Sequence, residues 1–278
     1  MHPTSPHEIT YCLGYWALLS NTKHSLNHYR NLLPQTLAMM RGANLLVLHD
    51  DPEFEAEVTE LARQNDIRLT SRQLPVTALP GWEVAAQAVE ACCASALDLA
   101  GPRPASLGYE KGVAHFWRDL TDSGPEVYRA MLAIWLSKVP LVASLAIDNP
   151  FDTPWFGWID ASVARCNGSR DHWNFAELAL RPNKILHYNS KMKMHGRLLP
   201  VAAGVLLGDR PAWDRFGAVY SEALPACLAQ AYGHDEETVI QAAHAHCPDL
   251  FECINPRPPL WRRALQRLLV AQESRSRL

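Results

Sequence analysis

The sequence predicts a single soluble α/β domain with a mainly parallel central sheet that helices flank. Three observations support this fold class. A length of 278 residues suits one large domain, and 48% apolar against 20% charged residues is an ordinary balance for a packed globule. Short apolar runs also alternate along the chain with segments of helical periodicity, which is typical of β-α-β units.

The first 65 residues show this alternation most clearly. Residues 9–16 are β-friendly and predict the first strand, and residues 28–40 carry apolar side chains at helical spacing. Residues 44–48 are wholly apolar, as in a strand buried on both faces. Residues 53–65 predict a helix with acidic residues in its first turn, where they suit the helix dipole. Strands joined through helices predict parallel pairing.

The rest of the chain continues the pattern less regularly. Residues 140–147 fit either a helix end or a strand, and residues 156–159 predict a short strand that ends at Asp160. Residues 198–207 form a second strand-like run. The remaining segments are predicted as a loop at 75–82, a mixed polar stretch at 161–194, and helices at 83–99, 109–120, 127–136, 212–232 (with Pro225 as a kink or break), 234–246 and 261–271.

Composition and charge narrow the classes of function. A formal net charge of -3 argues against general nucleic-acid binding. Seven scattered cysteines without a CxxC pair predict reduced thiols in the cytoplasm and no zinc cluster. The N-terminus lacks the pattern of a secretion signal, and the apolar runs are shorter than the ~20 residues that cross a bilayer. We therefore expect a cytoplasmic protein without a transmembrane segment, compatible with peripheral contact with a membrane.

Asp160 is the first candidate for a site residue. An apolar strand that ends in a carboxylate puts it at the carboxyl edge of the sheet, where open α/β sheets bind their ligands. Such a carboxylate can hold Mg²⁺ or Mn²⁺, which would bridge diphosphate oxygens. It can also cap the segment that follows. The residues alone leave both interpretations open.

Other polar groups admit two interpretations each. Asp50 and Asp51 follow a predicted strand but fit the start of the next helix better, and capping is also favoured for Asp235. Lys138 could pair with a phosphate or favour a helix C-terminus. Tryptophans near the candidate site could stack on a sugar or base, or simply fill the core. A basic stretch could grip phosphates or form an exposed loop, and it comprises Lys184, His187, Lys191, Lys193 and His195.

Several segments together resemble the bacterial HtrL/YibB-type family of glycosyltransferases. They occur in the family's order from about residue 9 to about residue 254. The resemblance implies one GT-A-like, Rossmann-like catalytic domain at 9–255 with a mixed, mainly parallel sheet, between a flexible N-terminus at 1–8 and a basic C-terminal helix and tail at 256–278. The matching segments are Ser137-Lys138, Asn149-Pro150-Phe151, Trp158-Ile159-Asp160-Ala161, residues 201–208, Asp235-Glu236 and residues 248–251.

The resemblance also implies a reaction and its residues. A sugar would move from a nucleoside-diphosphate sugar to an unknown acceptor, with Asp160 binding a divalent metal, Mn²⁺ or Mg²⁺, that holds the diphosphate. Asp235 and Glu236 would be catalytic, facing the transferred sugar or the acceptor, while Gly204 would line the acceptor side. The implied donor site comprises Asp160, Lys138, Trp158, Asn149, Gly204 and His187.

The chain departs from the family pattern at the acidic motif. The usual motif has two carboxylates separated by one residue, and Trp158 stands where the first would be. Ala203-Gly204 replaces a common Gly-Gly, and Ser162 replaces a Gly. Two alternatives therefore stay open. One is a non-catalytic relative that binds nucleotide sugars or glycans, and the other is a nucleotidyltransferase.

Overall fold

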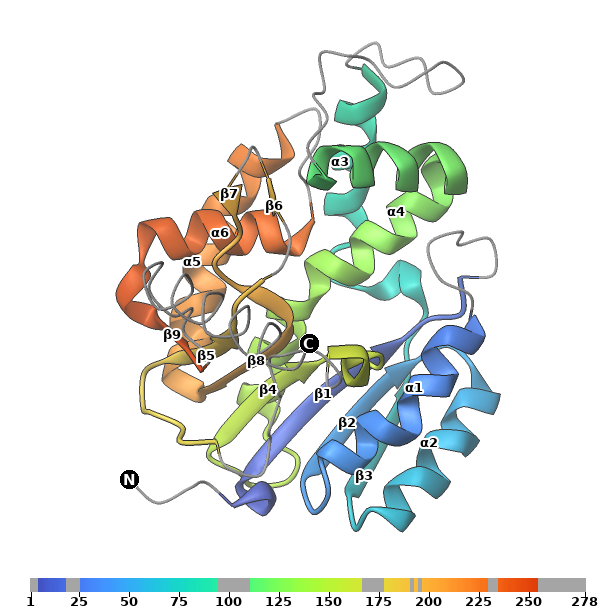
Figure 1. The fold of residues 1–278 in the computed structure, drawn as a ribbon, viewed down its shortest axis with the longest axis vertical. Helices are drawn as coiled ribbons and strands as arrows, with labels where there is room; N and C mark the ends of the chain where they lie inside the picture. The colour runs from blue at the N-terminus through green and yellow to red at the C-terminus, as the bar shows by residue number, and fades with distance from the viewer. Residues whose placement is uncertain are drawn as a thin grey trace, which may run out of the picture.

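The computed structural model describes residues 5–18, 26–94, 111–166, 178–190, 193–194, 197–229 and 235–254. Its centre is a seven-stranded sheet with the order β3-β2-β1-β4-β8-β5-β9, flanked by helices (Figure 1). Four neighbouring strand pairs in this sheet are parallel, and the pairs β4–β8 and β5–β8 are antiparallel. The predicted fold class, an α/β domain with a mixed and mainly parallel sheet, is confirmed.

The first half of the sheet follows the sequence closely. Strand β1 (Ile9–Tyr15), helix α1 (Leu26–Met39), strand β2 (Asn44–His49) and helix α2 (Pro52–Gln64) lie within a few residues of their predicted ranges. Strand β3 (Arg68–Gln73) was not predicted. It is one of the two edge strands of the sheet, and it lacks an apolar run because its side chains all face solvent at least partly.

Helix α4 (Lys111–Asp148) unites three separately predicted segments, and it follows helix α3 (Trp82–Ala94). A kink at Gly124, whose φ is +80°, interrupts it at the point where two helices were expected. The segment 140–147, which fitted a helix end or a strand, is the end of this helix. Pro140 lies inside α4, so the helix continues through a residue that usually ends one.

The segment Asp119–Asp148 of α4 is long and apolar enough, by length and composition, to cross a membrane. No single apolar run in the sequence is that long, but the helix joins several of them. Of its most apolar window, 61% is buried inside the protein, as in the core helix of a globule. A cytoplasmic location and peripheral membrane contact stay predictions.

The second half of the sheet was predicted only in part. Strand β4 (Trp155–Ile159) and strand β8 (Ala202–Asp209) correspond to expected strands, whereas β5 (Ile185–Tyr188) and β9 (Phe251–Cys253) were missed. Pro225 lies within helix α5 and does not break it. The predicted helix 261–271 lies outside the described residues. The other elements are helices α5 (Arg210–Leu228) and α6 (Glu236–His246), a two-stranded ribbon of β6 (Lys193–Met194) and β7 (Arg197–Leu198), and short 3₁₀ turns at Val76–Ala78, Val163–Cys166, Pro248–Leu250 and Pro6–Glu8, the last within the expected flexible N-terminus.

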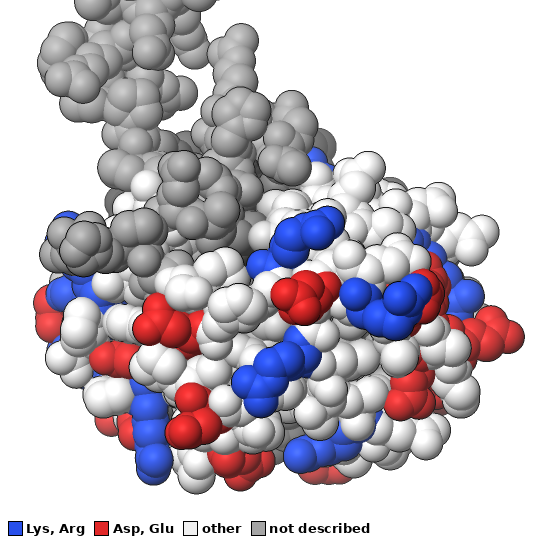
Figure 2. All heavy atoms as spheres, turned by 90° about the horizontal axis from the view of Figure 1, so that it is seen from below, with Lys and Arg blue, Asp and Glu red and all other residues white. Residues whose placement is uncertain are grey.

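The sheet separates two apolar cores. One contains side chains of α1 and α2 packed on one face of the sheet, and the other contains side chains of α3, α4, α5 and α6 packed on the opposite face. Strand β4 is shared, because Ile159 points into the first core and Trp158 into the second. On the face shown in Figure 2, basic and acidic side chains are interspersed.

Candidate active site

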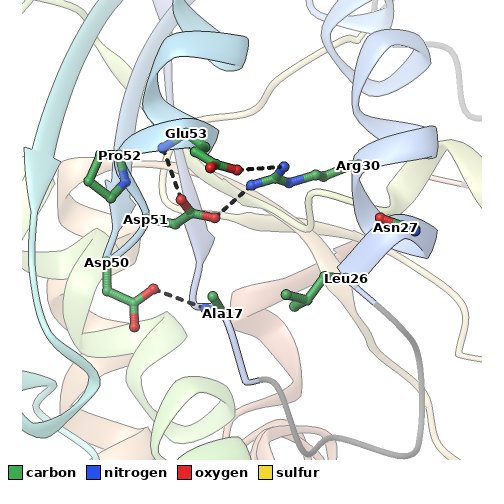
Figure 3. A pocket seen from close by; sticks show the side chains of 8 residues that line it. All are labelled: Ala17, Leu26, Asn27, Arg30, Asp50, Asp51, Pro52 and Glu53. Carbon is green, nitrogen blue, oxygen red and sulfur yellow. Dashed lines mark hydrogen bonds and ion pairs between the residues drawn. The ribbon is translucent and has the colours of Figure 1, made fainter.

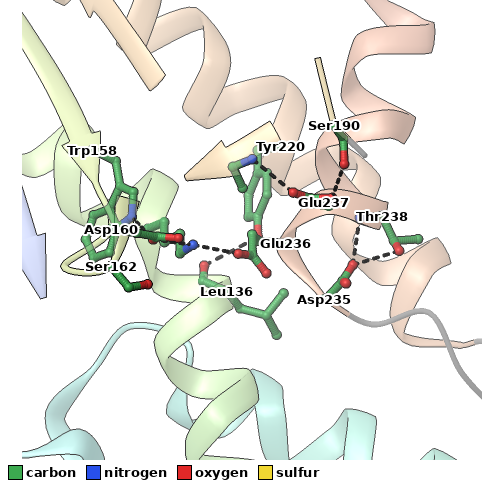
Figure 4. Close-up of polar contacts among 12 residues, drawn as sticks. Leu136, Trp158, Asp160, Ser162, Ser190, Tyr220, Asp235, Glu236, Glu237 and Thr238 are labelled. Carbon is green, nitrogen blue, oxygen red and sulfur yellow. Dashed lines mark hydrogen bonds and ion pairs between the residues drawn. The ribbon is translucent and has the colours of Figure 1, made fainter. Parts of the chain in front are cut away.

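Three charged side chains from distant parts of the chain meet at the end of β4. The Lys138 ammonium of α4 lies 2.8 Å from Asp160 Oδ1 and 2.6 Å from Glu236 Oε1. Asp160 directly follows β4, and Glu236 is the first residue of α6 (Figure 4). Lys138 is only 4% exposed, so this arrangement, called the Lys138 cluster below, is largely shielded from water.

Asp160 is held by several donors. Its Oδ1 also accepts a hydrogen bond from the Trp158 indole at 2.8 Å, and its backbone N–H donates to the Gly204 carbonyl at 2.9 Å. Arg165 Nη2 lies 3.9 Å from Oδ2. Burial by itself would raise the pKa of Asp160, but the charges of Lys138 and Arg165 outweigh it and lower that pKa. The carboxylate is therefore ionised at neutral pH.

Lys138 stays charged although it is buried. Desolvation alone would lower the pKa of its ammonium, but the charges and hydrogen bonds of Asp160 and Glu236 raise the pKa above its ordinary value. The ammonium also lies 5.6 Å from the centre of the Trp158 ring, over its face. Such a cation–π contact adds to the two ion pairs.

The alternation of β4 explains why Trp158 belongs to this cluster. Trp158 pairs with Cys12 of β1, and both point into the core beneath α4. Gly14 of β1 leaves room for the indole, since a Cβ there would lie 2.9 Å from the Trp158 ring. A buried indole N–H needs an acceptor, and Asp160, two residues later, supplies it.

The start of α6 adds two more carboxyl groups. Asp235 Oδ1 accepts hydrogen bonds from Thr238 N at 2.9 Å and Thr238 Oγ1 at 2.8 Å, which confirms the favoured capping interpretation (Figure 4). Glu237 receives hydrogen bonds from the Ser190 hydroxyl at 2.7 Å and from Ala203 N at 3.2 Å. Burial, with repulsion from Asp235 and Glu236, raises the pKa of Glu237 to about 8. Glu237 is therefore mostly protonated at neutral pH.

Two tyrosines border these charges. Burial, followed by the charge of Asp160, raises the pKa of Tyr29 on α1. Burial and then the charges of Glu236 and Asp235 raise the pKa of Tyr220 on α5, whose hydroxyl donates to the Leu136 carbonyl at 3.4 Å. Both hydroxyls thus remain neutral, and they can donate hydrogen bonds without adding negative charge.

A pocket of about 530 Å³ opens at the ends of β1 and β2 (Figure 3). Asp51 caps α2 by accepting from Glu53 N at 2.9 Å and pairs with Arg30 at 2.7 Å, which confirms its capping role. Asp50 accepts from Ala17 N at 2.9 Å and fixes the chain beyond β1. The lining residues are Ala17, Leu26, Asn27, Arg30, Asp50, Asp51, Pro52 and Glu53.

The structure does not bring Asn149 to the Lys138 cluster. Asn149 lies in the turn between α4 and β4, with φ +40°, and accepts from Thr153 N at 2.9 Å. The turn leads into the start of β4, and the hydroxyl of Thr153 in it hydrogen-bonds to the hydroxyl of Thr10 near the start of β1. Asn149 therefore lies near the amino ends of these strands, whereas Asp160 lies at the carboxyl end of β4. In this position the Asn149 side chain stabilises the turn.

His187 also lies apart from the charged groups. Its ring is buried on β5, with centres 6.4 Å from the His244 ring and 6.2 Å from the Phe251 ring. Burial lowers the pKa of His187 to about 4, so the imidazole is neutral and supplies no charge for a phosphate. Of the same basic stretch, Lys184 bonds to the Asp249 carbonyl, while Lys191 and His195 lie outside the described residues.

Three nearby groups had escaped the sequence interpretation. Arg165 has a recognisable signal in its spacing, since it lies in the short 3₁₀ turn Val163–Cys166 that follows Asp160. Glu237 belongs to a run of three acidic residues at the start of a helix. Only one of them can cap the helix, so the other two carboxyl groups need other partners. Tyr29 has no such signal, because only the packing of α1 on the sheet brings it near Asp160.

The residues present do not fit the predicted divalent metal at Asp160. Oδ1 already accepts from an ammonium and an indole, and the flanking positions hold Trp158 and Ser162 instead of a second carboxylate. The Ser162 hydroxyl accepts from Arg165 Nη1 at 2.6 Å. Among the described residues, no group of three or more His, Cys, Asp or Glu side chains is arranged to hold a metal.

Comparisons with known proteins give only distant similarity. No family model matches the chain, and no curated protein matches it. The apo form of the glycosyltransferase GlyE from Streptococcus pneumoniae TIGR4 aligns at 8% identity and a TM-score of 0.42, over 89% of this chain and 45% of that one. The chain thus spans less than half the length of GlyE.

Two further solved structures are described as a transferase and as its mutant with two cysteine-to-serine changes. They align at 10% and 12% identity with TM-scores of 0.44 and 0.38. Each alignment covers 90% of this chain, and 91% and 92% of the other. Similarity this low does not define a family for the chain.

Proposed function

We propose that the chain is a glycosyltransferase that moves a sugar from a nucleoside-diphosphate sugar to a glycan, lipid or small-molecule acceptor. The observation that carries this proposal is the convergence of Lys138, Asp160 and Glu236 at the end of β4. Ligands of open α/β sheets bind outside the carboxyl ends of the strands, where the strand order reverses. In this sheet the order reverses between β1 and β4.

The pocket at the ends of β1 and β2 suits the nucleoside. Its volume of about 530 Å³ is in the range of small-molecule sites. Asp50 uses Oδ1 for Ala17 N, which leaves Oδ2 as an acceptor for ribose hydroxyls. Both this pocket and the Lys138 cluster adjoin the end of β1, so one extended ligand could reach from the first to the second.

The phosphates of the donor would then meet Lys138 and Arg165. As the bond to the sugar breaks, negative charge grows on the leaving diphosphate, and fixed cations stabilise that charge. Asp160 and Trp158 would act as positioning residues, because they hold the ammonium through Oδ1 and through the indole face.

The acceptor would approach from the start of α6. Glu236 binds Lys138 through Oε1 alone, so Oε2 can accept a hydrogen bond from an acceptor hydroxyl and take its proton as the new bond forms. Asp235 would keep α6 in place for this step through its cap on Thr238. Gly204 would border the acceptor, since its carbonyl is bound to Asp160 N.

The test begins with a thermal-shift screen over nucleotide sugars, because a ligand that binds the folded state raises the melting temperature. The stabilising donor is then used to measure donor turnover in the Asp160→Asn variant. We expect turnover to be lost while the fold is kept, since Asn can still accept from Trp158 and Glu236 still pairs with Lys138. Asp249→Asn, at a carboxylate paired with Arg215 outside the site, is the matched control.

The same measurements separate the alternatives. Turnover by Asp160→Asn equal to that of the unmodified chain would contradict the assignment. Binding without turnover on any acceptor would favour a non-catalytic relative, which the absence of a carboxylate at Trp158 and Ser162 makes a definite second candidate. Transfer of a phosphate-bearing group, detected by mass spectrometry of the products, would indicate a nucleotidyltransferase.

A further inference from the structure

We propose that Lys138 and Arg165, in place of a divalent metal, supply the positive charge that meets the phosphates of the donor. The inference rests on the proposed function and states how the same site would neutralise its ligand. It follows from the partners of Asp160, from the lack of a carboxylate at the motif positions 158 and 162, and from the position of Arg165.

Asp160 Oδ1 has little coordinating capacity left for a metal. Oδ1 accepts two short hydrogen bonds, from Lys138 at 2.8 Å and from Trp158 at 2.8 Å. Oδ2 faces Arg165 at 3.9 Å. A metal ion on Oδ1 would lie within a few ångströms of the Lys138 ammonium, and two like charges at that distance repel strongly in a buried site.

The lysine cannot easily give way to a metal. Glu236 holds it from the other side at 2.6 Å, so the ammonium is bound by two carboxylates. At the two positions where an acidic motif would put a second carboxylate stand Trp158 and Ser162, and the Ser162 hydroxyl is bound to Arg165. A metal that used the remaining carboxylate oxygens, Asp160 Oδ2 and Glu236 Oε2, would thus compete with the Arg165 guanidinium and the Lys138 ammonium.

The two cations of the chain suit a phosphate. An ammonium has three N–H donors, and the described contacts of Lys138 use two of them, on Asp160 and Glu236. Arg165 is 45% exposed, so its guanidinium can turn from Asp160 to a ligand without a large desolvation cost. One guanidinium group can bind two phosphate oxygens at once through two parallel N–H···O hydrogen bonds.

The charge balance sets the strength of this binding. Lys138 and Arg165 together only offset Asp160 and Glu236, so the charges of these four side chains sum to zero before a ligand arrives. We therefore expect a modest affinity for a diphosphate that falls as salt is added, since salt screens the exposed Arg165.

The experiment is isothermal titration calorimetry of the full chain with UDP, GDP, ADP and dTDP. Each titration is run in EDTA and repeated with MnCl₂ and with MgCl₂. At least one nucleotide should bind with the same affinity, within about twofold, in all three conditions. Electron paramagnetic resonance of Mn²⁺ mixed with the protein alone should show the free ion only, which tests the inference without any nucleotide.

Arg165→Gln and Arg210→Gln make a matched pair. Arg210 on α5 is 56% exposed and lies 3.9 Å from Asp214, much as Arg165 is 45% exposed and 3.9 Å from Asp160. In EDTA, Arg165→Gln should weaken nucleotide binding by about tenfold, the usual effect of one charged hydrogen-bond donor. Arg210→Gln should bind as the unmodified chain does.

The outcomes are distinct. Binding that appears only with Mn²⁺ or Mg²⁺ overturns this inference and leaves the glycosyltransferase proposal standing. Failure of every nucleotide to bind in all conditions overturns that proposal and the inference with it. Equal affinity of Arg165→Gln and Arg210→Gln in EDTA removes Arg165 from the phosphate site and overturns the inference as stated.

Discussion

Lys138 is a single residue on which the whole candidate site depends. A buried lysine is stable only when anionic partners compensate its desolvation, and here Asp160 and Glu236 do so. Asp160 and Glu236 depend on Lys138 in turn, because without the ammonium their two carboxylates would repel each other in a largely buried site. Position 138 is therefore a structural position, and under the proposed function it is a functional one as well.

Lys138→Met should lower the free energy of unfolding by about 3 to 5 kcal/mol, because breaking a buried ion pair leaves its partners uncompensated. Urea unfolding followed by circular dichroism measures the change. Arg63→Met is the control, since Arg63 pairs with Glu60 at 2.6 Å on the surface and should matter little. An equally small effect of both variants would show that Asp160 and Glu236 do not need the lysine.

Glu237 predicts a pH dependence with a definite sign. Burial next to Asp235 and Glu236 raises its pKa in the folded state to about 8, above the value of a Glu in an unfolded chain. Between those two values the folded state binds a proton that the unfolded state releases, so this contribution to stability is lost as the pH rises. The window runs from about pH 4.5 to about pH 8.

Glu237→Gln should remove this loss of stability, because a neutral amide does not titrate. The variant should be more stable than the unmodified chain at about pH 9, and the difference should shrink toward about pH 5. Urea unfolding at several pH values measures both. Glu222→Gln, at an exposed position of α5, should leave the pH profile unchanged. A profile of Glu237→Gln parallel to that of the unmodified chain would refute the assigned shift.

At the scale of elements, the start of α6 combines two roles that substitutions can separate. Asp235 caps the helix through its bonds to Thr238, while its neighbour Glu236 binds Lys138. Loss of the cap would loosen the first turn of α6, and Glu236 lies in that turn. A defect after substitution of Asp235 therefore has two possible origins, the lost cap and a lost catalytic carboxylate.

Asp235→Asn and Asp235→Ala distinguish these origins. Asn caps a helix about as well as Asp, whereas Ala should cost about 1 kcal/mol of stability. If Asp235 only caps, Asp235→Asn should retain donor turnover and Asp235→Ala should lose part of it together with stability. Turnover and thermal unfolding of both variants give the answer. Loss of turnover in a stable Asp235→Asn variant would instead assign the carboxylate to the chemistry.

The accuracy of the sequence interpretation also varied by element. Strands β1, β2, β4 and β8 are buried and carry apolar runs, so hydrophobic patterning was sufficient to find them. Strand β3 is a polar edge, and β5 and β9 contain only four and three residues, too few for a period to show. Gly124 explains why α4 read as separate helices.

At the scale of the whole molecule, the sheet decides which predicted site residues come together. Lys138, Trp158, Asp160 and Glu236 had each been identified from the sequence, but their contact depends on α4 and α6 packing at the end of β4. Asn149 belongs to a segment that resembles the glycosyltransferase family, and yet it lies near the amino ends of β1 and β4, away from Asp160. Spacing along the chain carries no information about which end of a strand a turn occupies, or about the burial that leaves His187 neutral.

The lysine between Asp160 and Glu236 has a consequence for how such a protein becomes competent. The Lys138 ammonium is part of the polypeptide, so the positive charge is in position as soon as α4 and α6 pack on the sheet. Under the proposed role of Lys138 and Arg165, no metal would have to be loaded after folding, and a chelator would leave the site intact. The supply of manganese or magnesium would then not set how much of the folded protein is competent.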